Sequence, residues 1–341
     1  MSNSSVLGHE RARAFLFSAL VERRVAHAYL FAGPARIGKK LMALTFAKGI
    51  LCAGGPEGPC GDCPSCQKVS RGAHPDLLLV EPQADPGKEA KSLKIEQVRD
   101  LQRAISLKAH EGGCKIAIID DAELLTEQAG NALLKVIEEP PSSTYFILIA
   151  GSLNSLLPTL VSRCQIVPFI ALSEGQVAQL VRQTRGLEPQ EADLRAALSR
   201  GQVGRALDMD MELREELLSL AFLLLAPSPG PWVAGLQSQL QNLGRERQTF
   251  EEFLRLFLLL SRDLMALKSG AAEAQVVNRD KIPEMRRINL QLSPAVLGRI
   301  AAMISETLGQ LRANAYPQLA LEALAVRIAL GRACVKESYH V

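Results

Sequence analysis

The segment Gly33-Pro-Ala-Arg-Ile-Gly-Lys-Lys40 constrains the fold of this chain more than any other feature of its sequence. It follows a short apolar run, Ala28–Ala32, and opens a helix-like segment, Lys39–Leu51. The spacing GxxxxGK in this context predicts a phosphate-binding loop (P-loop), in which backbone N–H groups and Lys39 face a polyphosphate. The alternative is a glycine-rich turn kept only to pack a strand against a helix. Whether the loop at Gly33, Gly38 and Lys39 binds ATP therefore stays open.

Two positions differ from the pattern of a P-loop hydrolase. The residue after Lys39 should be Ser or Thr, whose hydroxyl holds Mg²⁺, but it is Lys40, a cation that cannot bind a metal ion while charged. A second apolar run ends in Asp120 and Asp121, where hydrolases carry a carboxylate that supports Mg²⁺ and then a Glu that activates water. Asp121 is one methylene shorter than Glu, and an error of about 1 Å can slow a reaction about a hundredfold. We therefore expect the fold of a P-loop ATPase without its hydrolysis chemistry.

The first half of the chain alternates between short apolar runs and helix-like segments. Strands buried on both faces read as apolar throughout, and their alternation with helices is typical of a parallel sheet covered by helices on both faces. The expected strands are Ala28–Ala32, Leu77–Val80, Lys115–Ile119, Thr144–Ala150 and Gln165–Phe169. The expected helices are Lys39–Leu51, Ile95–Leu107, Thr126–Glu139 and Leu156–Val161.

The pattern divides the chain into three domains. Residues 1–170 form the α/β module, 171–210 a small helical unit and 211–341 an all-helical part. In the last part, Thr249 and Glu252 suggest a capping box and Ser293-Pro294 a helix start. Ala226–Pro231 should be a loop, and Ala271–Pro283 a looser connection.

Four cysteines gather directly after the predicted P-loop helix, at Cys52, Cys60, Cys63 and Cys66. Two overlapping CxxC spacings and a fourth cysteine predict a structural zinc site with four thiolate ligands, rather than a redox pair. His74 is an alternative ligand, although a role in its own loop fits better. The remaining cysteines, Cys114, Cys164 and Cys334, lack ligand spacing and are expected to pack in the interior.

Composition limits the remaining classes of protein. The 341 residues are 48% hydrophobic and 22% charged with a net charge of +3, so charge alone does not demand nucleic acid. The N-terminus does not read as a signal peptide, and the longest apolar stretches are too short for a membrane span. We expect a cytoplasmic protein that does not contact membranes, with cysteines present as thiols or metal ligands.

Several phrases, in their order along the chain, resemble the clamp-loader branch of the AAA+ superfamily, which serves bacterial DNA polymerase III. The resemblance covers nearly the whole chain. The phrases are Val6-Leu-Gly-His-Glu10, His27-Ala-Tyr-Leu-Phe-Ala-Gly33, the cysteine insertion, His74-Pro-Asp76, Asn131-Ala-Leu-Leu-Lys-Val-Ile-Glu-Glu-Pro-Pro141, Leu160-Val-Ser-Arg-Cys164 and Asn314-Ala-Tyr-Pro-Gln-Leu-Ala-Leu-Glu-Ala-Leu324. It implies an AAA+ module with a zinc-bearing insertion, a helical lid and a helical collar that packs with other subunits.

The resemblance also implies a function. Clamp loaders place a sliding clamp on primed DNA, and Arg163 matches an arginine that reaches into the ATP site of a neighbouring subunit. The ATP-hydrolysing motor subunits (gamma/tau) differ from this chain at Lys40, Asp121 and Gly204, where a lid arginine stands in the motors. The chain thus resembles a non-hydrolysing, stator-like subunit with motor and delta subunits as partners, and has no polymerase activity of its own. The alternative is a gamma/tau-like motor.

Contact with DNA is less constrained by the sequence. Basic and acidic residues are mixed between Lys88 and Lys115, which fits a solvated helix face as well as weak contacts with a DNA backbone. Aromatic residues make up only 4% of the chain, so nothing suggests base stacking. A free-standing zinc-dependent DNA-binding module is a third hypothesis, and the collar-like C-terminal part favours an oligomer over it.

Overall fold

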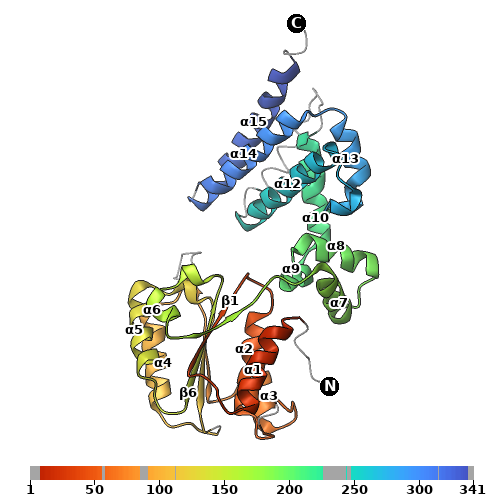
Figure 1. Cartoon of the computed structure of the whole chain (residues 1–341). Helices are drawn as coiled ribbons and strands as arrows, with labels where there is room; N and C mark the ends of the chain where they lie inside the picture. Colours follow the sequence, from red (N-terminus) through yellow and green to blue (C-terminus); the bar gives the residue numbers. More distant parts are fainter. Residues whose placement is uncertain are drawn as a thin grey trace. The chain divides into compact units, whose positions relative to one another are not determined.

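The structure is a computed structural model that describes residues 8–55, 58–84, 91–111, 113–225, 243, 247–313 and 315–336. The chain divides into two compact units, Met1–Leu207 and Asp208–Val341 (Figure 1). The first contains a parallel sheet, and the second is helical. No helix within the described ranges combines the length and the apolar character that a bilayer span requires.

The first unit is built on five parallel strands in the order β2-β5-β6-β1-β7. All five predicted strands are present, and the last one ends one residue earlier than expected, at Pro168. Their bounds are β1 Ala28–Ala32, β2 Leu77–Val80, β5 Lys115–Ile119, β6 Thr144–Ala150 and β7 Gln165–Pro168. The runs are apolar because helices cover both faces of the sheet.

Alternate residues of β1, β5 and β6 enter two separate cores. Tyr29 and Phe31 of β1 pack with α1 (Glu10–Val21) and α2 (Lys39–Leu51), whereas Ala28 and Leu30 pack on the opposite face. Figure 1 shows α1, α2 and α3 on one side of the sheet and α4, α5 and α6 on the other. The remaining elements are α3 Pro64–Ser70, α4 Ile95–Ser106, α5 Glu127–Glu138, α6 Pro158–Val161, the 3₁₀ turns η1 Ala122–Leu124 and η2 Leu153–Ser155, and the hairpin strands β3 Gln83–Ala84 and β4 Lys91–Ser92.

Three short helices complete the first unit: α7 Glu174–Arg185, α8 Pro189–Ser199 and α9 Val203–Asp208. Ser173 caps α7, since its hydroxyl accepts the Gln176 N–H while the Gln176 side chain accepts the Ser173 N–H. The three helices enclose a small core of their own, which includes Val177, Val181 and Ala196. They follow β7 directly along the chain and lie in the same compact unit as the sheet, apart from the last residue of α9.

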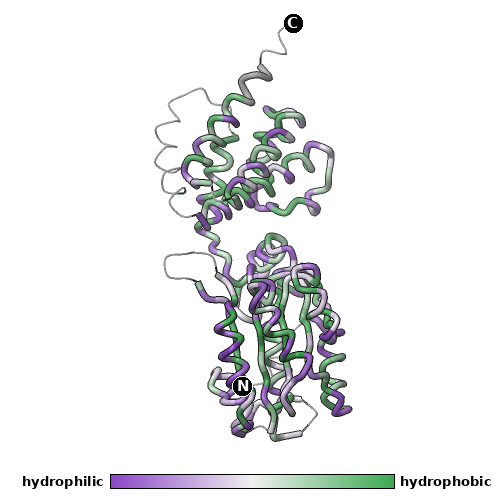
Figure 2. The backbone as a smooth tube through the Cα atoms, turned by 90° about the vertical axis from the view of Figure 1, so that its left-hand side faces the viewer, coloured by the Kyte–Doolittle hydropathy of each residue, from purple (hydrophilic) through white to green (hydrophobic). Residues whose placement is uncertain are grey.

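The second unit is formed by amphipathic helices around one core that contains Phe250, Phe253 and Phe257. Figure 2 shows green and purple residues alternating along these helices, as expected when one face of each is buried. Their bounds are α10 Met211–Leu225, α12 Arg247–Lys268, η3 Glu273–Gln275, η4 Arg279–Lys281, α13 Ile282–Asn289, α14 Pro294–Arg312 and α15 Pro317–Lys336.

One predicted helix start in this unit is confirmed and another is wrong. The Ser293 hydroxyl accepts the Val296 N–H at 3.3 Å, which confirms the predicted start of α14. The predicted capping box at Thr249 is wrong, because α12 is already helical from Arg247 and Thr249 lies inside its first turn. The loop predicted at Ala226–Pro231 lies outside the described residues.

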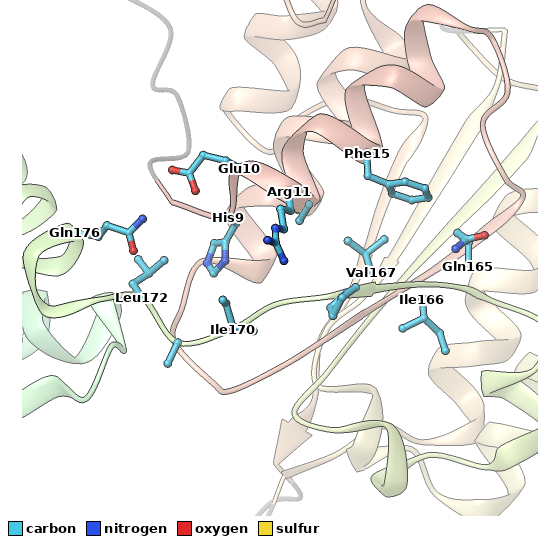
Figure 3. A pocket seen from close by; sticks show the side chains of 13 residues that line it. His9, Glu10, Arg11, Phe15, Gln165, Ile166, Val167, Ile170, Leu172 and Gln176 are labelled. Carbon is cyan, nitrogen blue, oxygen red and sulfur yellow. The ribbon is translucent and has the colours of Figure 1, made fainter.

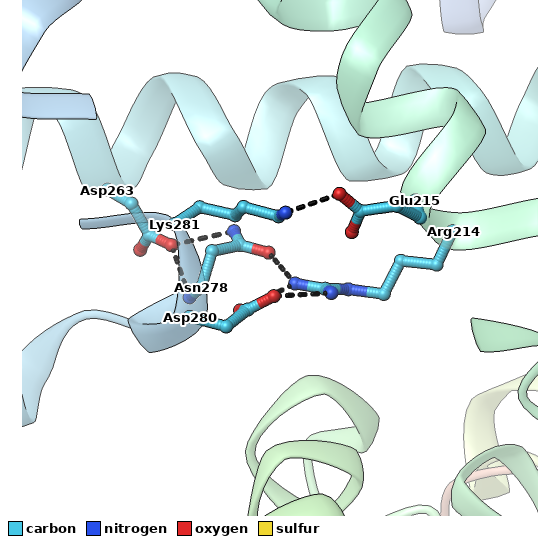
Figure 4. Close-up of polar contacts among 6 residues, drawn as sticks. All are labelled: Arg214, Glu215, Asp263, Asn278, Asp280 and Lys281. Atoms are coloured by element: carbon cyan, nitrogen blue, oxygen red, sulfur yellow. Dashed lines mark hydrogen bonds and ion pairs between the residues drawn. The ribbon is translucent and has the colours of Figure 1, made fainter. Parts of the chain in front are cut away.

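The connection predicted to be loose, Ala271–Pro283, is anchored by a buried polar network (Figure 4). Asp263 of α12 accepts the backbone and side-chain N–H groups of Asn278 at 2.9 and 2.8 Å. Arg214 of α10 donates to Asn278 at 2.9 Å and to Asp280 at 2.8 Å, and Lys281 pairs with Glu215. Because buried polar groups are stable only when paired, this network fixes the connection against two helices.

Candidate functional site

The predicted P-loop lies between β1 and α2, at the carboxyl end of β1. Gly38 caps α2 in the left-handed region at φ 101°. The Lys39 side chain is only 7% exposed, and its Nζ donates to the carbonyl oxygens of Gly33 at 2.5 Å and Pro34 at 2.8 Å. Burial lowers the pKa of Lys39, and the nearby carboxylates of Glu123, Asp121 and Asp120 oppose that shift. The loop therefore has the predicted form, with its lysine folded back onto the loop itself.

Lys40 points from the first turn of α2 toward the carboxyl ends of β5 and β2. Its Nζ lies 3.1 Å from Asp120 Oδ2 and also donates to Glu81, the residue after β2. Partial burial lowers the pKa of Lys40, but the hydrogen bonds to Glu81 and Asp120 outweigh it, so this pKa lies above its ordinary value. The predicted departure from the hydrolase pattern thus places an ammonium group, not a hydroxyl, beside the first carboxylate.

A Mg²⁺ ion does not fit this arrangement. The loop position that supplies a ligand oxygen in P-loop hydrolases here carries a cation, and Asp120 is already paired with it. Glu81 was not found from the sequence. The only signal for it was its place directly after an apolar run, which puts it at the same sheet edge as Asp120.

The second acidic position, Asp121, is exposed and adopts a left-handed backbone conformation, φ 46°. Partial burial raises its pKa, and repulsion from Asp120 and Glu123 adds to the shift. Glu123, also missed from the sequence, turns toward β6, where its Oε1 accepts the Gly151 N–H at 2.9 Å. Four carboxylates therefore surround the two lysines of the loop.

Contacts from outside the sheet hold two carbonyl groups of the P-loop. The Gly204 N–H of α9 donates to the Arg36 carbonyl at 2.8 Å, and His9 Nε2 lies 2.8 Å from the Ile37 carbonyl. The His9 ring also meets the edge of Phe169, with ring centroids 4.9 Å apart. Gly204 is thus a point where the small helical unit touches the loop.

Arg163 lies in the short turn between α6 and β7. Its side chain is 39% exposed, and its guanidinium forms an ion pair with Glu138 at 2.6 Å. It also donates to the carbonyl of Thr159 at 3.1 Å. These partners, Glu138 and Thr159, are not residues of the P-loop.

The four predicted metal ligands converge. The Sγ atoms of Cys52, Cys60, Cys63 and Cys66 all lie within 4.8 Å of one another. Backbone N–H groups donate to the sulfurs, including Cys60 N–H to Cys52 and Cys66 N–H to Cys63, both at 3.4 Å. A tetrahedral ion with metal–sulfur distances of about 2.3 Å needs sulfurs about 3.8 Å apart, so the donor set fits zinc.

The protonation of this cluster is uneven. The Cys66 N–H lowers the pKa of Cys63 to about 6, whereas burial raises the pKa of Cys66 to about 12. His74 is not part of the cluster: it is buried, and its Nδ1 accepts the Asp76 N–H at 3.1 Å. Burial raises the pKa values of Cys114 and Cys164 to about 11, as expected for packing residues. The side chain of Cys334 lies outside the described residues.

A separate cavity of 520 Å³ lies between α1, β7 and the start of α7 (Figure 3). Its lining is mainly apolar and includes Phe15, Val167, Ile170 and Leu172, with His9 at one side. Neither lysine of the P-loop lines it, so this cavity is distinct from the phosphate-binding loop.

The basic segment suggested for DNA contact is only partly available. Lys115 is buried and donates to the Ala104 carbonyl, so its inclusion in a solvent-facing basic surface was wrong. Arg99, Arg103 and Lys108 are exposed, and Arg103 pairs with Asp100. Lys88 and the side chain of Lys91 lie outside the described residues.

Comparisons with known proteins identify relatives of the chain. The family model described as "DNA polymerase III, delta subunit" matches residues 8–173. The DNA polymerase III subunit delta' of Bacillus subtilis is 30% identical over 328 residues, which are 94% of this chain and 96% of that protein. The subunit delta' of Pseudomonas aeruginosa is 40% identical over 172 residues, 49% of this chain and 50% of that protein. The subunit tau of Bacillus subtilis is 24% identical over 350 residues, 95% of this chain and 60% of that protein.

Proposed function

The chain belongs to the delta' family of DNA polymerase III clamp-loader subunits, and from this premise we propose that it is a subunit that does not itself hydrolyse ATP. The observation that carries the proposal is the ion pair between Lys40 and Asp120. Hydrolysis by P-loop enzymes needs a metal ion at this point to neutralise developing charge. Asp121, shorter than the usual Glu and exposed, adds a second reason.

In this role the subunit acts on the ATP site of a neighbour. We propose that Arg163 leaves Glu138 on assembly and supplies its guanidinium to a gamma/tau motor subunit. An arginine provided in trans can change a rate by about 10³–10⁵ in P-loop systems. The ion pair with Glu138 is about two-fifths exposed on both sides, so breaking it costs about 0.2–1 kcal/mol. That cost is small against the charge stabilisation available in the motor's site.

The test compares Arg163→Ala with Arg24→Ala in a reconstituted assembly with motor and delta subunits, clamp and primed DNA. Arg24 is a matched control, because it is also an exposed arginine paired with an exposed glutamate, Glu22. We expect clamp-dependent ATPase to fall by about tenfold or more with Arg163→Ala, given the range for arginines donated in trans, and to stay unchanged with Arg24→Ala. The melting temperature of the isolated chain should move little in both variants. Unchanged ATPase with Arg163→Ala would remove the catalytic role and leave an interfacial salt bridge.

We further infer that the cysteine cluster holds structural zinc. The four thiolate donors would fill the coordination of the ion, which leaves no position for substrate. Zinc would replace missing hydrophobic packing in the turns between α2 and α3. The residues 171–210 would serve as the lid and 211–341 as the collar that joins other subunits, supported by the separate cores of these helices.

Contacts with DNA would be weak and limited to the phosphate backbone. The exposed residues Arg99, Arg103 and Lys108 are the candidates that remain. Such contacts would be independent of sequence and would weaken steeply with salt. Loss of affinity of the intact assembly for primed DNA on replacing all three by Ser would support them, and unchanged affinity would count against them.

The alternative, an ATP-hydrolysing motor, is favoured by one observation: the loop keeps its GxxxxGK form and Lys39 is in place. Steady-state ATP hydrolysis by the isolated, zinc-loaded chain distinguishes the two functions. Turnover that vanishes with Lys39→Ala would establish a motor. No turnover in folded protein is the expected result.

A further inference from the structure

We propose that the ammonium group of Lys40 permanently takes the place of the divalent cation at this P-loop, so that the site excludes Mg²⁺. In P-loop hydrolases the residue at this position ligates the ion through a hydroxyl oxygen. Here the side chain brings its own positive charge to the same carboxylate, Asp120, at 3.1 Å. The charge is covalently attached, so it cannot exchange with the solvent or leave with a nucleotide.

The neighbouring strands explain why a cation is needed here. β2 and β5 are paired in parallel with Val80 opposite Ile119, and the Asp120 N–H donates to the Val80 carbonyl at 3.0 Å. Glu81 and Asp120 therefore leave the sheet side by side. Two neighbouring carboxylates repel each other unless a cation lies between them. Lys40 contacts both and provides that charge.

The burial of the three groups supports a fixed arrangement. The Asp120 side chain is 17% exposed and Lys40 is 38% exposed, so their attraction is screened less than that of a fully exposed pair. Glu81 is also held through its backbone, since Gln97 Nε2 donates to its carbonyl at 2.8 Å. Lys40 thus joins α2, β5 and the end of β2 without any ligand.

The two adjacent lysines have different tasks. Within the part of the chain that the structure describes, Lys39 donates only to carbonyls of its own loop, where an incoming phosphate could compete for it. Lys40 neutralises carboxylates instead, which is the task of the metal ion in a hydrolase. The inference concerns metal binding by the isolated chain, so it stands or fails separately from the proposed work of Arg163.

The test uses the full-length, zinc-loaded chain in buffer freed of divalent cations by a chelating resin, because a soluble chelator would strip the zinc. Wild type is compared with Lys40→Thr and with Lys48→Thr, a control on the same helix α2. Melting temperature is measured with and without Mg²⁺, and binding of Mn²⁺ alone is followed by its electron paramagnetic resonance signal.

We expect no response to either metal in wild type and Lys48→Thr. Lys40→Thr should melt lower without metal, and Mg²⁺ at about tenfold excess over its Kd should raise its melting temperature by about 3–5 °C. The double variant Lys40→Thr/Asp120→Asn should lose that response, which would locate the ion at Asp120.

Mn²⁺ binding by wild type that Asp120→Asn abolishes would overturn the inference. Failure of Lys40→Thr to gain any metal response would also overturn it. If Lys40→Thr does not fold, Lys40→Arg and wild type still decide the matter: both keep the charge and must remain without a metal response.

Discussion

Gly201 lies between α8 and α9 and contacts the segment that connects β7 to α7. Its backbone is in the left-handed region at φ +80°, and its carbonyl accepts the Leu172 N–H at 3.2 Å. A Cβ atom added here would lie 2.5 Å from the Leu172 carbonyl oxygen and 2.8 Å from Ala171 Cβ. The change Gly201→Ala therefore tests how closely this linker must approach the chain between β7 and α7.

Two costs follow from this geometry. Alanine in the left-handed region costs about 1–2 kcal/mol. The overlap with backbone atoms cannot be relieved by a side-chain rotation, and forced displacement of packed groups adds about 1–3 kcal/mol. Gly186 is a matched control, because it is also left-handed (φ +66°) but has nothing within 4 Å of an added Cβ. Gly186→Ala should thus lose only the about 1–2 kcal/mol that alanine costs in the left-handed region.

The assay is native-state hydrogen exchange of α7 and α8, which reports local opening without the assumption that the whole chain unfolds in one step. The difference of about 1–3 kcal/mol predicts exchange about 5–150 times faster in Gly201→Ala than in Gly186→Ala. Exchange of β5 and β6 should be equal in the two variants. Equal rates in α7 and α8 would refute the close approach.

Two further predictions concern stability. Removing the zinc proposed for the cysteine cluster, or the change Cys60→Ser, should make residues 52–66 sensitive to proteolysis and lower the melting temperature, while the circular dichroism of the sheet persists. Unchanged protease resistance would contradict a structural metal. Asp263→Ala should lower the stability of the helical unit by about 2–5 kcal/mol, because two buried donors of Asn278 lose their acceptor. The free energy of unfolding is measured by urea denaturation, followed through the circular dichroism of the helices, and Glu252→Ala, at an exposed position, is the control. A loss of stability below about 1 kcal/mol would show that the network is not needed.

The sheet could be predicted from the sequence because burial on both faces makes each strand apolar throughout. Ala28–Ala32 and Thr144–Ala150 are such runs, and the structure gives them the expected bounds. The helices α1 and α3 were not predicted. α3 is short and begins within the cysteine cluster, at Cys63 as its N-cap. Thr249 misled the prediction because the two residues before it, Arg247 and Gln248, also favour a helix.

For the candidate site, motif spacing identified the loop, the carboxylate pair and the cysteines. It could not identify Glu81, Glu123 or His9, because their contacts depend on which strands and helices are neighbours in space. The pairing of β2 with β5 brings Glu81 beside Asp120, and no local pattern encodes that pairing. The contact of Gly204 with Arg36 is hidden for the same reason.

The joint contact of Lys40 with Asp120 and Glu81 has an evolutionary consequence. The change Lys40→Thr alone would leave the carboxylates of Asp120 and Glu81 side by side without a counter-ion. A chain that first lengthened Asp121 to Glu would gain a base for water but no metal to orient the phosphate. Substitutions at contacting positions such as these are not additive, so the effect of either change depends on the other. In the non-hydrolysing subunit that we propose, the ion pair of Lys40 with Asp120 would therefore oppose a gain of ATP hydrolysis by single substitutions.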